Sequence, residues 1–119
     1  MDGETSTNDA FIGINSGKKI DKKLLSKIQT GIDIVCQSLA KNIARDGEGA
    51  NCLLEVVVKG AKNNSDGIKI AKSICNSSLV KTAINGCDPN WGRIISAAGN
   101  SGIDFKLDFL DLYLSLIHI

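Results

Sequence analysis

A charged loop that contains two glycines is the first feature of this sequence that could do chemistry. Residues Arg45 to Gly49 combine three charged side chains with two glycines, and the carboxylate of Glu48 lies between the glycines. The loop lacks GxGxxG spacing, and no Lys-Ser or Lys-Thr pair follows it, so it does not predict a nucleotide site. A turn that needs glycine explains the spacing as well as a ligand site does, and from spacing alone we favour the turn.

A second polar cluster lies near the start of the sequence, where Thr5, Ser6, Thr7, Asn8 and Asp9 follow one another. Short polar side chains of this kind bond to nearby backbone groups and build local turns. They could also line a pocket for a polar substrate. The residue types alone favour the turn.

The other residues of chemical interest do not form a catalytic pair. His118 is the only histidine, so a Ser-His or Cys-His pair has no second candidate. Arg93 could hold a carboxylate with its planar guanidinium, although a surface ion pair is the commoner role. Trp91 is expected to anchor a core or an interface rather than stack on a ligand. An enzyme containing this chain would therefore need another kind of base.

The cysteines do not have the spacing of a metal site. No two of them are separated by two residues, so we expect neither zinc nor a thioredoxin-like pair. The residues after Met1 are polar and acidic, unlike an export leader. We therefore expect a cytoplasmic protein with reduced thiols, while two disulfides stay an unsupported alternative. The four positions are Cys36, Cys52, Cys75 and Cys87.

The composition is that of one ordinary globular domain. The chain has 119 residues, of which 43% are hydrophobic and 23% charged, with a formal net charge of +1. Such a weak charge does not favour nucleic acid or an anionic membrane as a partner. No apolar stretch approaches the roughly 20 residues that a membrane helix needs.

The elements that must position these residues can be located from hydrophobic spacing. Apolar residues recur every three or four positions from Ile20 to Ile43, which predicts an amphipathic helix. Residues 52–59 are rich in valine and predict the best strand. Further strands are expected at 10–14 and 105–114, and helices at about 66–75 and 90–98. The order predicts an α+β fold, with helices layered on a mixed or antiparallel sheet.

Several motifs, in order, resemble the ornithine acetyltransferases (glutamate N-acetyltransferases) of arginine biosynthesis. The resemblance covers about residues 2–113 and suggests an internal piece of the second, beta chain of such an enzyme. The matching segments are Asp2–Asp9, Ile43–Ala50, Ile70–Ile74, Leu79–Ile84, Asp88–Ile94 and Ala97–Gly99. Ser78 and Gly13 depart from the residues usual in the family.

The resemblance implies acetyl transfer from N-acetylornithine to glutamate, and some members also use acetyl-CoA. In the family, a precursor cuts itself at a threonine, which then carries the acetyl group as an ester. That threonine lies upstream of the matching region, so Thr5 and Thr7 are not its equivalents. Glu48 matches a substrate-binding glutamate and is the one site residue that the resemblance assigns to this chain. The family implies no cofactor, a partner segment from the alpha chain, and oligomers of two-chain protomers.

We interpret residues 1–113 as a partial acetyltransferase domain. Leu114 to Ile119 do not resemble the family, and a transposon end used in sequencing libraries would encode the same six residues. We interpret these six residues as an adapter scar, which would remove His118 from any chemistry. The alternative function is a non-catalytic domain that binds a small ligand or a partner.

Overall fold

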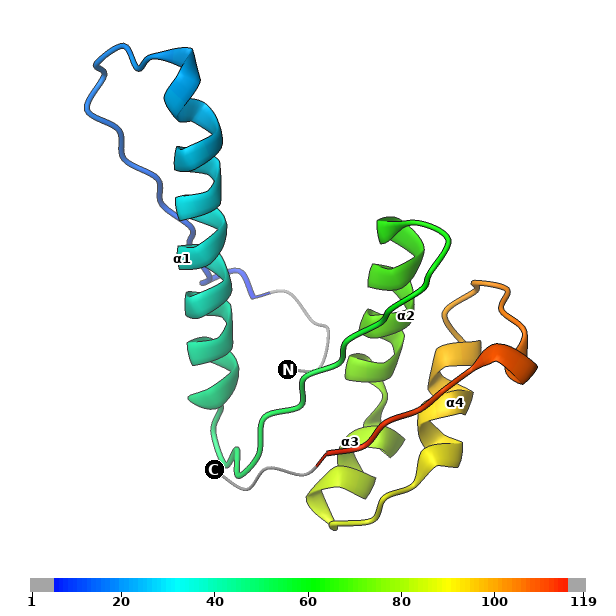
Figure 1. Cartoon of the computed structure of the whole chain (residues 1–119). Helices are drawn as coiled ribbons and strands as arrows, with labels where there is room; N and C mark the ends of the chain where they lie inside the picture. Colours follow the sequence, from blue (N-terminus) through cyan, green and yellow to red (C-terminus); the bar gives the residue numbers. More distant parts are fainter. Residues whose placement is uncertain (1–5, 116–119) are drawn as a thin grey trace. The chain divides into compact units, whose positions relative to one another are not determined.

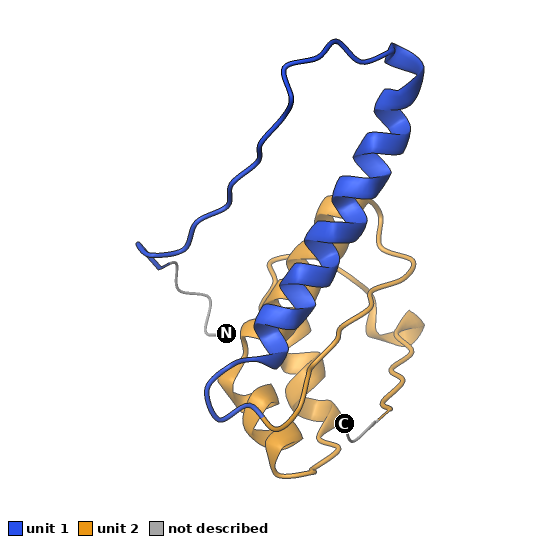
Figure 2. Ribbon diagram, turned by 90° about the vertical axis from the view of Figure 1, so that its left-hand side faces the viewer, with its two compact units in different colours: residues 1, 3–50 blue, residues 2, 51–119 orange. Residues whose placement is uncertain are grey.

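The structure is a computed structural model that describes residues 6–115. It divides into two compact units, which within the described residues comprise 6–50 (unit 1) and 51–115 (unit 2). Figure 1 shows the helices and Figure 2 colours the two units. Each unit is considered by itself below.

Unit 1 is dominated by one long helix, α1 (Leu25–Arg45). A 3-10 turn, η1 (Lys22–Leu24), precedes it, and the Asp21 carboxylate caps this turn by accepting a 3.0 Å hydrogen bond from the backbone N–H of Lys23. The predicted helix is confirmed, but its start is later than Ile20 because residues 15–20 do not take up helical structure. None of the described residues of α1 is buried, and its apolar stripe is exposed.

Unit 2 contains three helices, α2 (Asn64–Asn76), α3 (Ser78–Asn85) and α4 (Trp91–Gly99), followed by a 3-10 turn, η2 (Leu107–Phe109). Each helix begins at a side-chain cap, which satisfies a backbone N–H that has no partner within the helix. The caps are Asn63 for α2, Ser77 for α3 and Asn90 for α4. The helices at 66–75 and 90–98 are therefore confirmed.

The core of unit 2 lies where α2, α3 and α4 meet. Its buried members are Ile74, Val80, Ala97 and Ala98, and partly buried side chains from outside the helices pack against them, including Leu54, Val56 and Phe105. The two small alanines of α4 let α2 approach closely, and the Ser73 hydroxyl donates a 2.6 Å hydrogen bond to the carbonyl oxygen of Ala97. Segments on both sides of the helices therefore contribute to one core.

The predicted α+β fold with helices on a sheet is wrong for the described residues. Residues 6–115 contain helices and turns but no strand, including at the predicted strands 10–14, 52–59 and 105–114. Residues 54–59 alternate between half-buried and exposed positions, as a strand on a core would. A strand also needs a second backbone to accept and donate its hydrogen bonds, and no such ladder forms here. The valine-rich sequence thus predicted a strand that does not form, although residues 54–59 show the alternating exposure of one.

Candidate functional site

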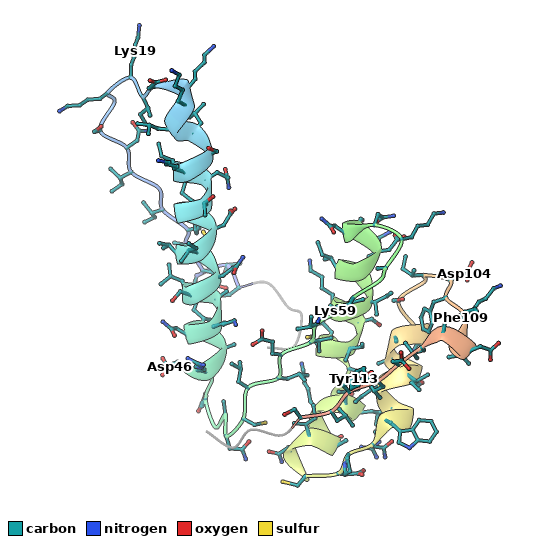
Figure 3. The ribbon with its side chains drawn as sticks, viewed as in Figure 1. Lys19, Asp46, Lys59, Asp104, Phe109 and Tyr113 are labelled. Atoms are coloured by element: carbon teal, nitrogen blue, oxygen red, sulfur yellow. The ribbon has the colours of Figure 1, made fainter. Side chains whose placement is uncertain are left out.

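The loop that carries Glu48 begins where α1 ends. The backbone N–H of Asp46 closes the helix by donating a 2.9 Å hydrogen bond to the carbonyl oxygen of Asn42, and Figure 3 shows Asp46 at this end of α1. The N–H of Ala50 then donates to the carbonyl oxygen of Gly47 at 2.9 Å, which closes a four-residue turn. The predicted tight loop is confirmed.

The turn requires a glycine at its third position. Gly49 has a φ of +69°, a left-handed conformation that side chains with a Cβ rarely adopt and that type II turns place at this position. Glu48 occupies the second position and is exposed. The turn interpretation of the glycines is therefore correct, and the same turn presents the Glu48 carboxylate to solvent, where it could accept hydrogen bonds from an ammonium group.

The polar cluster near the N-terminus forms a local turn within the described residues. The N–H of Asn8 donates to the Ser6 hydroxyl oxygen at 3.1 Å, and the Thr7 hydroxyl donates to the Asn8 side-chain oxygen at 3.5 Å. These contacts agree with the turn that the residue types favour, and all of residues 6–9 are exposed. Thr5 lies outside the described residues, as does His118.

Arg93 binds backbone and side-chain oxygens of α3. Its Nη1 donates to the carbonyl oxygen of Leu79 at 3.1 Å and to the Thr82 hydroxyl oxygen at 3.3 Å. These contacts tie α4 to α3 and give the guanidinium a structural role. Trp91 starts the same helix with 65% of its surface exposed, so the expected place in a core is wrong, and a role at an interface stays a prediction.

The four cysteines are free thiols. Burial raises the pKa of the Cys75 thiol, and the nearby positive charge of Lys81 opposes this effect in part. A raised pKa keeps the thiol protonated and poorly nucleophilic at neutral pH. Within residues 6–115 no group of three or more histidine, cysteine or acidic side chains could hold a metal ion. None of the described helices combines the length and hydrophobicity needed to cross a membrane.

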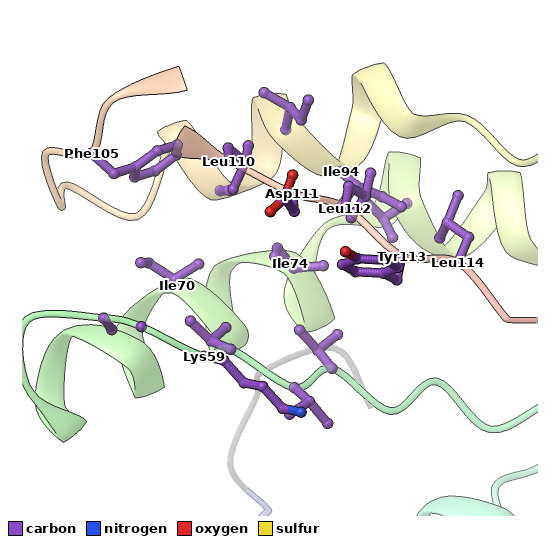
Figure 4. A pocket seen from close by; sticks show the side chains of 18 of the residues that line it. Lys59, Ile70, Ile74, Ile94, Phe105, Leu110, Asp111, Leu112, Tyr113 and Leu114 are labelled. Atoms are coloured by element: carbon purple, nitrogen blue, oxygen red, sulfur yellow. The ribbon is translucent and has the colours of Figure 1, made fainter. Parts of the chain in front are cut away.

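Unit 2 contains an apolar cavity that the sequence did not predict. The cavity has a volume of about 470 Å³ and lies between α2, α4 and the segments 54–61 and 105–114, as Figure 4 shows. Ile70, Ile74 and Leu112 line it, and Lys59 and Asp111 lie among the polar lining residues. Glu48 belongs to unit 1 and is not among the lining residues. The apolar residues of segment 54–58 were the available signal, although three consecutive valines do not show which of them face the cavity.

Comparisons with known proteins identify the class to which this chain belongs. The ArgJ family matches it over residues 1–119, so the chain belongs to the ArgJ family. The arginine biosynthesis bifunctional protein ArgJ of Prochlorococcus marinus subsp. pastoris is 93% identical over 114 residues, which are 96% of this chain and 28% of that protein. A chloroplastic relative of the same name from Sorghum bicolor is 48% identical over 124 residues, covering 98% of this chain and 27% of the relative.

A solved relative agrees in structure as well as in sequence. The crystal structure of arginine biosynthesis bifunctional protein ArgJ from Bacillus halodurans superposes with a TM-score of 0.80 at 45% identity. The match covers 88% of this chain and 52% of that one. The resemblance read from the motifs is thus confirmed at the level of the family, and the chain spans little more than a quarter of the length of the curated relatives it matches.

Proposed function

We propose that this chain is part of a glutamate N-acetyltransferase that moves an acetyl group from N-acetylornithine to glutamate in arginine biosynthesis. The observation that carries the proposal is the 93% identity to a protein named as a bifunctional enzyme of that pathway. Acetyl-CoA is a further candidate donor, since the relative is named as a bifunctional protein. The four free thiols are in keeping with a reducing compartment such as the cytoplasm.

In the proposed reaction, the nucleophile is a threonine that is not among the residues of this chain. Its hydroxyl would attack the acetyl carbonyl of N-acetylornithine, form an ester and release ornithine, and glutamate would then take the acetyl group from the ester. An N-terminal threonine can use its own α-amine as the base, which suits a chain without a catalytic histidine pair. Hydrogen-bond donors from the other chain of the protomer would stabilise the oxyanion of each tetrahedral intermediate.

We assign substrate binding to Glu48. The turn between Gly47 and Ala50 exposes its carboxylate, and a carboxylate forms strong, charge-assisted hydrogen bonds with the α-ammonium group that ornithine and glutamate share. Glu48 would act in binding rather than in bond making, because it would hold ornithine after its release and glutamate before the acetyl group is transferred to it. Residues 6–9 and Arg93 receive no part in this proposal.

The test is a chimera in which residues 1–113 replace the matching stretch of the Prochlorococcus relative. We expect the chimera to transfer acetyl groups from N-acetylornithine to glutamate, and residues 1–119 alone to be inactive because they lack the nucleophile. In the chimera, Glu48→Gln should raise the KM for glutamate, the substrate with a free α-amino group, by about 10- to 100-fold, the equivalent of a lost hydrogen bond to a charged group.

Asp46→Asn is the matched control, since it removes a charge from the same exposed loop without touching the position assigned to substrate. Its KM should stay close to that of the parent chimera. An unchanged KM in Glu48→Gln would exclude the assigned site but leave the function standing. A folded chimera without acetyl transfer would overturn the proposed function itself.

A further inference from the structure

We draw no further inference here: the strongest candidate, the apolar cavity of unit 2 between the segments 54–61 and 105–114, is an uncovered apolar face, and nothing in the described structure shows what covers it.

Discussion

Val80 in α3 is 1% exposed, whereas Ile32 in α1 is 48% exposed, although each lies on the apolar face of an amphipathic helix. The contrast extends to the two units. The helices of unit 2 pack against one another and bury side chains from α2, α3 and α4, while no described residue of α1 is buried. An amphipathic sequence is therefore common to both helices, but the apolar face is buried in a core only where partner helices cover it.

The comparison also separates two sources of stability. A helix of 21 residues such as α1 can hold some structure through its own backbone hydrogen bonds, although isolated helices in water are only marginally stable. The shorter helices of unit 2, the briefest of which is α3 with 8 residues, depend on packing and on their caps. Substitutions in unit 2 should consequently cost more than matched substitutions in unit 1.

Val80→Asp should have the largest effect. The substitution places a carboxylate at Val80, which is 1% exposed and lies among the apolar side chains of the unit 2 core, so the carboxylate would lose its hydration. We expect a loss of about 4 kcal/mol or more in the free energy of unfolding, enough to abolish the cooperative transition of unit 2. Denaturant titration of residues 1–119, followed by far-ultraviolet circular dichroism, measures this loss.

Two control substitutions allow the stability of Val80→Asp to test the difference between unit 1 and unit 2. Leu79→Asp adds the same charge to α3 at a position that is 60% exposed and should change stability by about 0.5 kcal/mol or less. Ile32→Asp makes the matching change on the apolar face of α1 and should also cost far less than Val80→Asp. Equal losses in the free energy of unfolding for Ile32→Asp and Val80→Asp would mean that the apolar face of α1 is packed. The contrast between the two units would then be wrong.

Ser73→Ala should have an intermediate effect. The Ser73 hydroxyl is half-buried and joins α2 to the Ala97 carbonyl oxygen of α4, so its removal leaves an interhelical acceptor without this donor. We expect a loss of about 1 kcal/mol, the usual contribution of such a bond. The same denaturant titration measures it.

The matched change in unit 1 is Thr30→Ala. The Thr30 hydroxyl donates to the carbonyl oxygen of Ser26 within α1 and joins no second element. Because alanine also favours helix more than threonine does, stability should stay the same or rise slightly. A larger loss for Thr30→Ala than for Ser73→Ala would contradict the view that contacts between helices stabilise unit 2.

The sequence was informative for most elements whose structure depends on neighbours along the chain. The spacing of apolar residues predicted α1, and the polar residues before α2 and α4 indicated where those helices begin. The cap of α2 is Asn63, whose side chain accepts a hydrogen bond from the N–H of Asp66 and donates one to the Asp66 carboxylate. The turn around Gly49 was likewise a local property.

The sequence was misleading wherever structure depends on a distant partner. The valines of residues 52–59 favour extended backbone, but a strand exists only when a second segment pairs with it, and residue types do not reveal that segment. The helix α3 is a different case, since it was not predicted although the Ser77 side chain that caps it lies only three residues from the Val80 N–H that it accepts from. The prediction of Glu48 as a site residue depended on the family resemblance. The spacing of the residues around it could not provide it, because a glycine turn and a ligand loop share the same residue types.

Gly31→Ala should have a smaller effect than Val80→Asp or Ser73→Ala, and the opposite sign. Gly31 lies within α1, and a Cβ added there would meet nothing within 4 Å, so the substitution costs no steric strain. Alanine loses less backbone entropy in a helix than glycine does, by about 0.5 to 1 kcal/mol. We expect greater helicity for residues 1–119, measured by far-ultraviolet circular dichroism at 222 nm.

Gly102→Ala is the paired substitution in unit 2. Gly102 follows α4 with a φ of +73°, a conformation that alanine adopts only with strain, so this change should lower stability although the space around it is equally open. When Gly31→Ala and Gly102→Ala are also measured in the chimera, the two substitutions test whether another segment packs against α1 there. If Gly31→Ala raises helicity in residues 1–119 but lowers the stability of the chimera, another segment must approach α1 at Gly31, because only a neighbour there can reverse the intrinsic preference for alanine.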